Sequence, residues 1–456
     1  MAYCEECFQK QLKIEGLQDE IKRLKEQLRY RQQKEKEGFF RSSTPSSKIP
    51  VKENTPVRDH KPKGARPGHK GKGRQKITEA EADRIEDIFY GSTCPSCGGV
   101  LTDNGFDTRG VLDMPPVKVQ RIVYRLHKGY CKRCNKSFEP KAPGVMPKWL
   151  HGNQLNAMTV AMHYLHGIPM GRICEQTGIE AGALVEIFHN LAKLFQEVPQ
   201  RLIEQYRGSA VKHADETGWR QNGKNGYAWL FATETISIFL FKPSRSAKVV
   251  KEILGEKPLP GVLVVDRYAG YNKAPCALQY CYSHIKREVE DTEKEFSESE
   301  EVKTFASVML PLLTDAMRLR NQPIPDEEFY ERASEVKSQI TAAVQAPARH
   351  LGIRHIQDIF HDNAHRMYHW ADDRKVPAEN NLAERDLRPT MIARKTSFGS
   401  VSDAGAQTRS ILMSVLHTLR KRKVDVSARF KEVLDQLSQD RHADPFSLLF
   451  RSDSSP

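Results

Sequence analysis

Apolar residues near the start of the chain repeat with the period of a coiled coil. Five of them follow one another at spacings of 3, 4, 3 and 4 residues, with Glu, Lys and Arg around them. Such a heptad seam predicts that residues 1–40 form a leucine-zipper coiled coil, and hence a homodimer or a higher assembly. A single amphipathic helix packed on its own protein is the alternative. The seam consists of Ile14, Leu17, Ile21, Leu24 and Leu28.

Helical spacing returns between residues 146 and 205, where apolar residues such as Leu155, Met158 and Met162 lie three or four positions apart. The stretch GIPMGRICEQTGIEAGALVEIFHNLAKLFQEV then predicts two helices joined by a turn at Gly178. This arrangement is typical of a helix-turn-helix reader of DNA. It is also typical of an ordinary helical hairpin, and the sequence leaves both interpretations open.

The pattern changes to strands after residue 206. SAVKHADETGWRQNG, NGYAWLFATET and ISIFLFKP predict antiparallel strands, and GVLVV predicts a short buried strand after a helix in SAKVVKEILG. These elements predict a mixed α/β domain over residues 206–430, with a charged helical insertion at about 286–375. Within it, SILMSVLHTLRKRK is expected to form a basic amphipathic helix. Residues 431–456 are expected to be a C-terminal tail.

The net charge of the chain indicates a polyanionic partner. The chain has 71 Lys and Arg against 58 Asp and Glu, a net charge of +13, and an isoelectric point near 9.2. Nucleic acid is therefore the expected partner. Residues 41–76 are rich in Pro, Gly and Ser and carry most of the excess, which predicts a disordered basic linker. Its Lys70, Lys72 and Arg74 are candidate DNA-phosphate contacts; a plain solubilising linker is the alternative.

No membrane segment is expected. The opening MAYCEECFQK has no apolar core of a signal peptide, and the apolar strip YAWLFATETISIFLF is interrupted by Glu234. The protein is expected to be cytoplasmic and associated with the nucleoid.

Four of the nine cysteines form two CxxC pairs separated by 33 residues. Each CxxC turn directs two sulfurs at one ion, so the two pairs predict a tetrahedral structural Zn²⁺ site in a zinc ribbon over residues 77–145. The intervening VKVQRIVYRLHKGY alternates as a strand does. Cys4 and Cys7 form one more pair with no neighbouring partner, and no role is assigned to them. The predicted zinc ligands are Cys94, Cys97, Cys131 and Cys134.

Three acids stand out by their positions. Asp215 lies in the first predicted strand, Asp266 ends the buried apolar strand, and Glu384 begins a helix just after two asparagines. A carboxylate at the end of a buried strand is costly unless it is paired or binds a metal. Carboxylates suit Mg²⁺, and two such ions can support phosphodiester cleavage. Three structural ion pairs are the alternative that spacing alone does not exclude.

Three blocks of sequence closely resemble the transposases of the insertion sequence 66 family. They are HADETGWRQNGKNGYAWLF, GVLVVDRYAGYN and PAENNLAERDLRPTMIARKTSFGSVSDAGAQTRSILMSVLHTLRKR. The resemblance implies a multidomain protein with an α/β ribonuclease H-like DDE catalytic domain that carries a helical insertion. A coiled coil, a zinc ribbon and a helical DNA-binding region would precede it. It also implies a catalytic triad of Asp215, Asp266 and Glu384 that uses Mg²⁺ or Mn²⁺.

The implied activity is that of a bacterial DNA transposase. It would bind the terminal inverted repeats of its element, hydrolyse phosphodiester bonds and join the 3′ ends to target DNA. The cations that follow the third acid would face DNA; they are Arg385, Arg388, Arg394 and Lys395. The resemblance further implies small accessory proteins of the same element as partners.

A Cys-x-x-His signature follows the second acid at Cys281 and His284. Several DDE transposase families carry a similar signature, so His284 is a candidate to contact the scissile phosphate or to steady the site. A core histidine beside a buried cysteine is the alternative. Tyr282 stands where the family usually has Trp.

Two other functions compete with an active transposase. A catalytically silent DNA-binding regulator, or a remnant of an element, would need only the zipper, the ribbon and the linker. An intact triad argues against it. A structure-specific nuclease of the same fold, such as a junction resolvase, fits the zipper and the ribbon poorly.

Overall fold

The computed structural model describes residues 13–14, 16–28, 78–82, 84–88, 92, 95–100, 107–109 and 119–451. The chain divides into two compact units, residues 51–121 and the remainder, which we treat separately. The predictions for the linker at 41–76, with Lys70, Lys72 and Arg74, lie outside the described residues. So do those for Cys4, Cys7 and Cys94.

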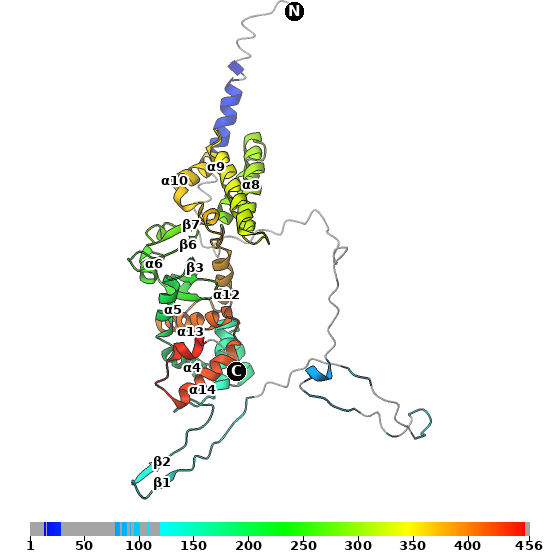
Figure 1. Ribbon diagram of the computed structural model, residues 1–456, viewed down its shortest axis with the longest axis vertical. Helices are drawn as coiled ribbons and strands as arrows, with labels where there is room; N and C mark the ends of the chain where they lie inside the picture. Colours follow the sequence, from blue (N-terminus) through cyan, green and yellow to red (C-terminus); the bar gives the residue numbers. More distant parts are fainter. Residues whose placement is uncertain are drawn as a thin grey trace, which may run out of the picture. The chain divides into compact units, whose positions relative to one another are not determined.

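The predicted N-terminal helix is present over the described residues 13–14 and 16–28 (Figure 1). The five apolar residues of its seam are each about half exposed, from 47% for Ile14 to 56% for Leu28. A seam of this kind is left uncovered within one chain, which agrees with the expectation that it meets another helix.

A five-stranded mixed sheet forms the centre of the larger unit (Figure 1), in the order β5-β4-β3-β6-β7. β3 pairs antiparallel with β4, and β4 with β5; β6 lies parallel to β3 and β7 parallel to β6. The three antiparallel strands and the buried strand were all predicted. The strands are β3 (Val211–Gln221), β4 (Lys224–Ala232), β5 (Ser237–Lys242), β6 (Val262–Val265) and β7 (Ala277–Tyr280).

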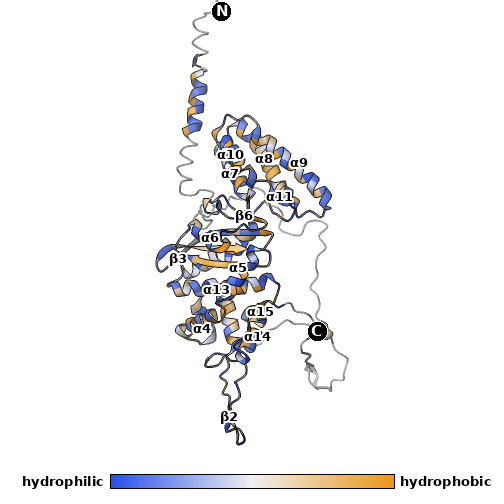
Figure 2. Ribbon diagram, turned by 60° about the vertical axis from the view of Figure 1, so that its left-hand side comes forward, coloured by the Kyte–Doolittle hydropathy of each residue, from blue (hydrophilic) through white to orange (hydrophobic). Residues whose placement is uncertain are grey.

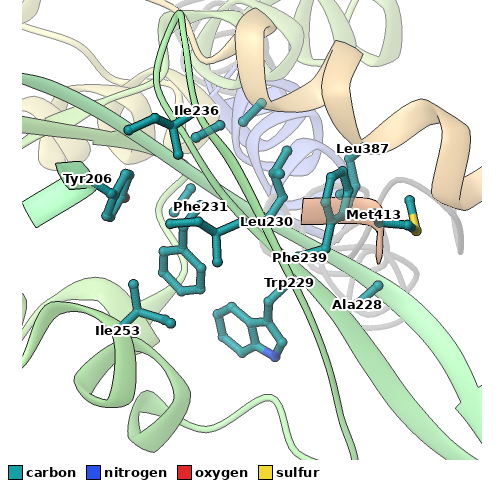
Figure 3. Packing of buried hydrophobic residues seen from close by; sticks show 14 of the residues in the cluster. Tyr206, Ala228, Trp229, Leu230, Phe231, Ile236, Phe239, Ile253, Leu387 and Met413 are labelled. Atoms are coloured by element: carbon teal, nitrogen blue, oxygen red, sulfur yellow. The ribbon is translucent and has the colours of Figure 1, made fainter. Parts of the chain in front are cut away.

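Helices cover both faces of this sheet (Figure 2), which explains the apolar runs of β4, β5 and β6. On one face, Trp229 and Phe231 of β4 stack with an interplanar angle of 6° and meet Tyr206 and Ile253 (Figure 3). On the other face, Leu230 turns toward helices α12 and α13 (Figure 3). The helices are α5 (Val198–Arg207), α6 (Ala247–Leu254), α12 (Asn381–Ser397) and α13 (Asp403–Lys421).

Helix α13 closes the outer edge of the sheet with a hydroxyl ladder. Three side-chain hydroxyls, four residues apart on α13, accept hydrogen bonds from alternate backbone N–H groups of the edge strand β5. Buried backbone donors need such partners, and β5 has no strand on that side. The pairs are Phe241 N with Ser410 Oγ (3.2 Å), Phe239 N with Ser414 Oγ (2.9 Å) and Ser237 N with Thr418 Oγ1 (3.1 Å).

The ladder corrects one prediction. A helix over SILMSVLHTLRKRK is confirmed, but the expectation that it is amphipathic is wrong, because every residue from 408 to 419 is buried. Its cations gather at the last turn, where Lys421 pairs with Asp386 of α12. The Ser and Thr residues that give this stretch a polar side in the sequence are the ones that accept hydrogen bonds from the backbone of β5.

The region before the sheet is helical, as predicted. It contains α2 (Asn153–Val160), the π-helical turn η3 (Ala161–Leu165), α3 (Met170–Thr177) and α4 (Ala181–Leu194). Gly178 ends α3 with φ +69°, so the turn lies at the predicted residue. Helix α4 buries five residues, including Leu184 and Phe188, and packs on α13. Lys193 is a cation among its exposed side chains, and the interpretation of this hairpin as a DNA reader stays a prediction.

The C-terminal segment differs from the expected tail at 431–456. Helix α14 (Val426–Gln439) runs through the predicted boundary, and α15 (Pro445–Phe450) follows it. Both bury apolar residues in the main core, among them Val433, Leu434 and Leu449. Residues 431–451 are therefore part of the folded domain, with α14 packed against α2.

The helical insertion is confirmed between β7 and α12. Its helices are α7 (Tyr282–Glu295), α8 (Glu300–Leu319), α9 (Asp326–Gln345), α10 (Leu351–Asp362) and the short α11 (His369–Asp372). Short 3₁₀ turns are η2 (Glu79–Glu81), η4 (Ala269–Tyr271) and η5 (Ala364–Arg366). Among the described residues, no helix is both long enough and apolar enough to cross a membrane.

Among the described residues of the predicted ribbon, the two strands form a small hairpin. β1 (Gly129–Cys131) pairs antiparallel with β2 (Lys136–Phe138), and Asn135 in the turn has φ +53°. The described residues 119–128 are irregular and almost all exposed, so the predicted strand is wrong there. An alternating pattern predicts a strand only where one face is buried, and residues 121–128 have none.

Candidate active site

Two of the three predicted acids lie at the same level of two neighbouring parallel strands, Asp215 within β3 and Asp266 directly after β6. The pairing of β3 with β6 aligns His213 with Val264. Asp215 and Asp266 each come two residues later, so the register carries them to the same level. The chain reaches Asp266 through the buried run Val262–Val265, and the carboxyl group turns back so that Oδ1 accepts a 2.9 Å hydrogen bond from Tyr268 N.

Helix α12 brings the third acid to the same place. Glu384 lies in the first turn of α12, and Asn380 caps that turn. The Asn380 side chain donates a 2.8 Å hydrogen bond to Ala214 O and accepts one of 2.9 Å from His213 Nδ1. Both partners belong to β3 directly before Asp215. One buried asparagine therefore fixes the start of α12 beside the first acid.

The electrostatics indicate that these carboxylates are close to one another. Burial raises the pKa of Asp215 well above its usual value, and the charges of Glu216, Asp266 and Glu384 raise it further. Burial also raises the pKa of Asp266 to about 7, with the charge of Glu216 adding to the effect. Acids that repel one another in a buried site are a place where a cation is favoured.

A fourth acid, Glu216, lies behind the site on the opposite face of β3, as strand alternation predicts. It pairs with Trp229 of β4, whereas Asp215 pairs with Leu230. Its side chain is 1% exposed, and its Oε1 accepts a 2.8 Å hydrogen bond from Arg245 Nε. Tyr271 O–H donates to the other oxygen. Arg245 and Tyr271 thus fix the Glu216 carboxylate, whose charge raises the pKa of both Asp215 and Asp266.

The predicted His284 lies next to the third acid. Ligand atoms of Cys281, His284 and Glu384 all lie within 4.8 Å of one another, the one such group found among the described residues. Cys281 Sγ accepts a 3.2 Å hydrogen bond from Asn380 N, and burial raises the pKa of this thiol to about 12. The charge of His284 lowers the pKa of Asp266. His284 is therefore not an isolated core histidine.

The four predicted DNA-binding cations on α12 divide into two groups. Arg385, Arg388 and Lys395 are exposed. Their spacings of 3 and 7 residues place them along one side of the helix. Arg394 is half-buried, and its Nη1 donates a 2.8 Å hydrogen bond to Gly218 O of β3. The sequence did not reveal this difference, because neighbouring positions on a helix face different ways.

The donor set of the acid cluster fits a hard divalent cation. Mg²⁺ prefers carboxylate oxygens with water in the remaining positions, and the three acids offer such oxygens from three separate elements; in the described residues the ligand atoms that lie within 4.8 Å of one another are those of Cys281, His284 and Glu384. Tyr271, Arg245 and Asn380 are functional supports that sequence reasoning missed. The adjacent asparagines at 380 and 381 were noted, but nothing in the sequence says which of them is buried.

The zinc-ligand candidates are partly described. Cys131 ends β1 and Cys134 lies in the turn before β2. Hydrogen bonds from the backbone and side chain of Cys134 lower the pKa of the Cys131 thiol, which favours the thiolate that zinc needs. Cys97 belongs to the other unit, where Gly98 follows it with φ +73°.

Comparison with known families defines the class of protein. Residues 148–408, more than half of the chain and all three acids, match the model described as Transposase IS66 family. Residues 92–135, which span the four predicted zinc ligands, match the zinc-finger binding domain of transposase IS66. Both models describe transposases.

The chain belongs to the IS66 family of transposases. It is also similar to two proteins of Sinorhizobium fredii, Uncharacterized protein y4jD and Uncharacterized protein y4qI. The first is 24% identical over 75% of this chain and 74% of its own length. The second is 23% identical over 79% of this chain and 74% of its own length.

Proposed function

We propose that this protein is an active DDE transposase that cleaves DNA at the ends of its element and joins the 3′ ends to target DNA. The observation that carries the proposal is the convergence of Asp215, Asp266 and Glu384 from β3, β6 and α12. The sheet order supports a ribonuclease H-like catalytic domain, with three antiparallel strands followed by two parallel strands, one acid within the central strand β3 and one directly after the neighbouring β6.

In this proposal the three acids hold catalytic Mg²⁺, or Mn²⁺ in its place. When bound, the metal ions would activate the attacking water or 3′ hydroxyl and stabilise the leaving oxygen. Asp215 and Asp266 supply fixed oxygens from the rigid sheet. Glu384 supplies an oxygen from a helix that Asn380 holds in register with β3. His284 steadies the charge of Asp266 beside the scissile phosphate.

DNA is the proposed substrate and partner, as element ends and as target. Arg385, Arg388 and Lys395 lead away from Glu384 on exposed α12, where they would contact phosphates and so position the cleaved bond. The predicted ribbon would hold structural Zn²⁺ through Cys94, Cys97, Cys131 and Cys134. The N-terminal helix would pair with a second copy through its exposed seam.

The test is an Mg²⁺-dependent cleavage and joining assay with DNA carrying the ends of the protein's own element. Asp215→Asn, Asp266→Asn and Glu384→Gln keep side-chain size and remove charge. Each should lower the cleavage rate on the order of 100- to 1000-fold or more while DNA affinity is retained. Glu327→Gln, an exposed acid in the first turn of α9, is the matched control.

Two outcomes would contradict the proposal. Undiminished cleavage in one of the three variants would remove that residue from the triad. Tight DNA binding without cleavage by the wild type, even when the neighbouring gene products of the element are added, would favour a catalytically silent regulator.

A further inference from the structure

Phe398, directly after α12, is an aromatic side chain presented to solvent by a strained backbone. Its side chain is 75% exposed, the largest value for an aromatic residue among the described residues. Its φ is +58°, in the left-handed region that bulky side chains avoid. Val401, three residues on, is 90% exposed. Exposure and strain together at one residue suggest a use for that side chain.

The loop that carries Phe398 is held firmly on the β3–β4 hairpin. Ser400 N donates a 2.9 Å hydrogen bond to Arg220 O, and Ser400 O accepts one of 2.9 Å from Asn222 N. Trp219 Nε1 donates to Ser400 Oγ at 3.1 Å. A side chain at Gly399 would lie 2.2 Å from Arg220 O, so only glycine fits there. The loop is thus a rigid mount for the ring.

The surroundings of Phe398 are basic on the side that leads to the acids. Arg385, Arg388 and Lys395 are exposed along α12 between Glu384 and Phe398. Asp403 is an exposed acid farther on, and its Oδ1 accepts a 2.7 Å hydrogen bond from Gln221. A phosphate backbone that follows the three cations along α12 would therefore arrive at the aromatic ring.

The separation between Glu384 and Phe398 along α12 can be expressed as a length of DNA. Phe398 comes fourteen residues after Glu384, which corresponds to about 21 Å along a helix at 1.5 Å per residue. At about 3.4 Å per base pair, this is the length of about six base pairs. The cleaved bond and the ring would thus contact the same DNA segment at different positions.

We propose that Phe398 is a wedge that enters the base stack of the bound element end and stacks on an unpaired base about six base pairs from the cleaved phosphate. This inference rests on the proposed function for the position of the DNA. Apolar wedges such as Phe kink duplexes by unstacking one step, and a base–aromatic contact repays the cost. The rigid mount spares the ring the entropy of being ordered on binding.

The decisive variant is Phe398→Gly. Glycine tolerates positive φ, so this substitution relieves backbone strain while it removes the ring. Full-length protein binds element-end DNA with Ca²⁺ in place of Mg²⁺, which allows binding without cleavage. Thymines at about five to seven base pairs from the cleaved bond are then probed with permanganate, which attacks unstacked thymine. Phe398→Trp tests rescue, and Tyr330→Ala, an exposed aromatic on α9, is the control.

The wild type should make one thymine in this window hyperreactive. Phe398→Gly should abolish the reactivity and weaken binding about 10-fold, with an unfolding temperature equal to or above that of the wild type. Phe398→Trp should restore both, and Tyr330→Ala should change neither.

An unchanged reactivity pattern in Phe398→Gly would overturn the wedge. So would a change in the oligomeric state of the free protein without any change on DNA, because the ring would then contact a second copy. A hyperreactive thymine with no cleavage in Mg²⁺ would sink the proposed function and leave the wedge standing. Cleavage without a hyperreactive thymine would overturn the wedge and leave the proposed function standing.

Discussion

The side-chain amide of Asn380 donates a 2.8 Å hydrogen bond to the backbone oxygen of Ala214, 166 residues earlier in the chain. This bond joins the residue before Asp215 to the residue that caps the helix of Glu384. The whole helical insertion lies between β7 and Asn380. Asn380 therefore holds the chain that leaves the insertion against β3 at the acid site.

Asn380→Ala should loosen the third acid without removing a carboxylate. The variant leaves His213 Nδ1 and Ala214 O without their partner in a buried place. We expect the free energy of unfolding to fall by about 1–3 kcal/mol. Cleavage should fall more than DNA affinity does. Chemical denaturation and the cleavage assay measure the two effects.

Asn321→Ala, at an exposed position after α8, is the control and should change stability by less than about 0.5 kcal/mol. If Asn380→Ala cleaves DNA at the wild-type rate, Glu384 is positioned by other contacts.

The raised pKa of Asp266, about 7, predicts a pH dependence of stability in the absence of divalent metal. The pKa of an aspartate in the unfolded chain is near 3.9. Between these values the folded chain binds the extra proton, so this residue's contribution to the unfolding free energy is lost as pH rises from about 4 to about 7. Added Mg²⁺ should restore stability at pH 8 more than at pH 5.5.

Buried histidines act in the opposite direction. Burial lowers the pKa of His213 to about 4, so that its contribution is lost as pH falls below about 6.5. The measurement is therefore the difference between the wild type and Asp266→Asn in urea denaturation across this range. The predicted effect of Asp266 is contradicted if the unfolding free energies of the wild type and Asp266→Asn change in parallel with pH.

The exposed cations of α12 should determine part of the salt dependence of DNA binding. Replacing Arg385, Arg388 or Lys395 with Ala should lower the slope of log K against log salt by about 0.9 for each phosphate that the protein no longer neutralises. Arg394→Ala should instead lower stability, because the Arg394 guanidinium donates a hydrogen bond to Gly218 O. Lys375→Ala, at an exposed site before α12, is the control, and equal slopes in all variants would remove α12 from the DNA interface.

Zinc should be lost when one ligand of the predicted ribbon is removed. We expect about one zinc ion per chain in the wild type and none in Cys97→Ser or Cys134→Ser. DNA binding should weaken, while the unfolding of the catalytic domain should not change. Metal analysis of purified protein gives the answer. Cys174→Ser on α3 is the control, and zinc retained in both ligand variants would refute the ribbon.

Dimerisation through the N-terminal helix should depend on its seam. Leu24→Lys places a charge in the seam and should shift the protein to a monomer in sedimentation analysis. Asp19→Lys lies on the opposite side of the helix and should leave the assembly unchanged. A wild-type protein that is already a monomer would favour the alternative of a single amphipathic helix.

Periodicity and local chemistry predicted much of this fold because they act over short distances. The three antiparallel strands and the turn at Gly178 follow from hydrophobic alternation and backbone preference. The candidate acids could be named because Asp266 ends a buried strand and Glu384 begins a helix. Their convergence depends on strand order, which no local pattern specifies.

The parts that failed depend on contacts between distant residues. Ser410, Ser414 and Thr418 look like the polar side of a surface helix, yet β5 buries them. Glu216 looks like a second candidate ligand, and its hydrogen bonds with the distant Arg245 and Tyr271 show that its oxygens already have partners. Long-range pairing of polar groups leaves little trace in a single sequence.

The hydroxyl ladder between α13 and β5 also limits how copies of this protein can assemble. An edge strand with free backbone N–H groups invites strand addition from another chain, a route to both domain exchange and aggregation. At β5 three of these donors are already taken by serine and threonine side chains. Strand addition at β5 is therefore blocked in any assembly of several copies. On this side the catalytic sheet remains a closed unit in each copy.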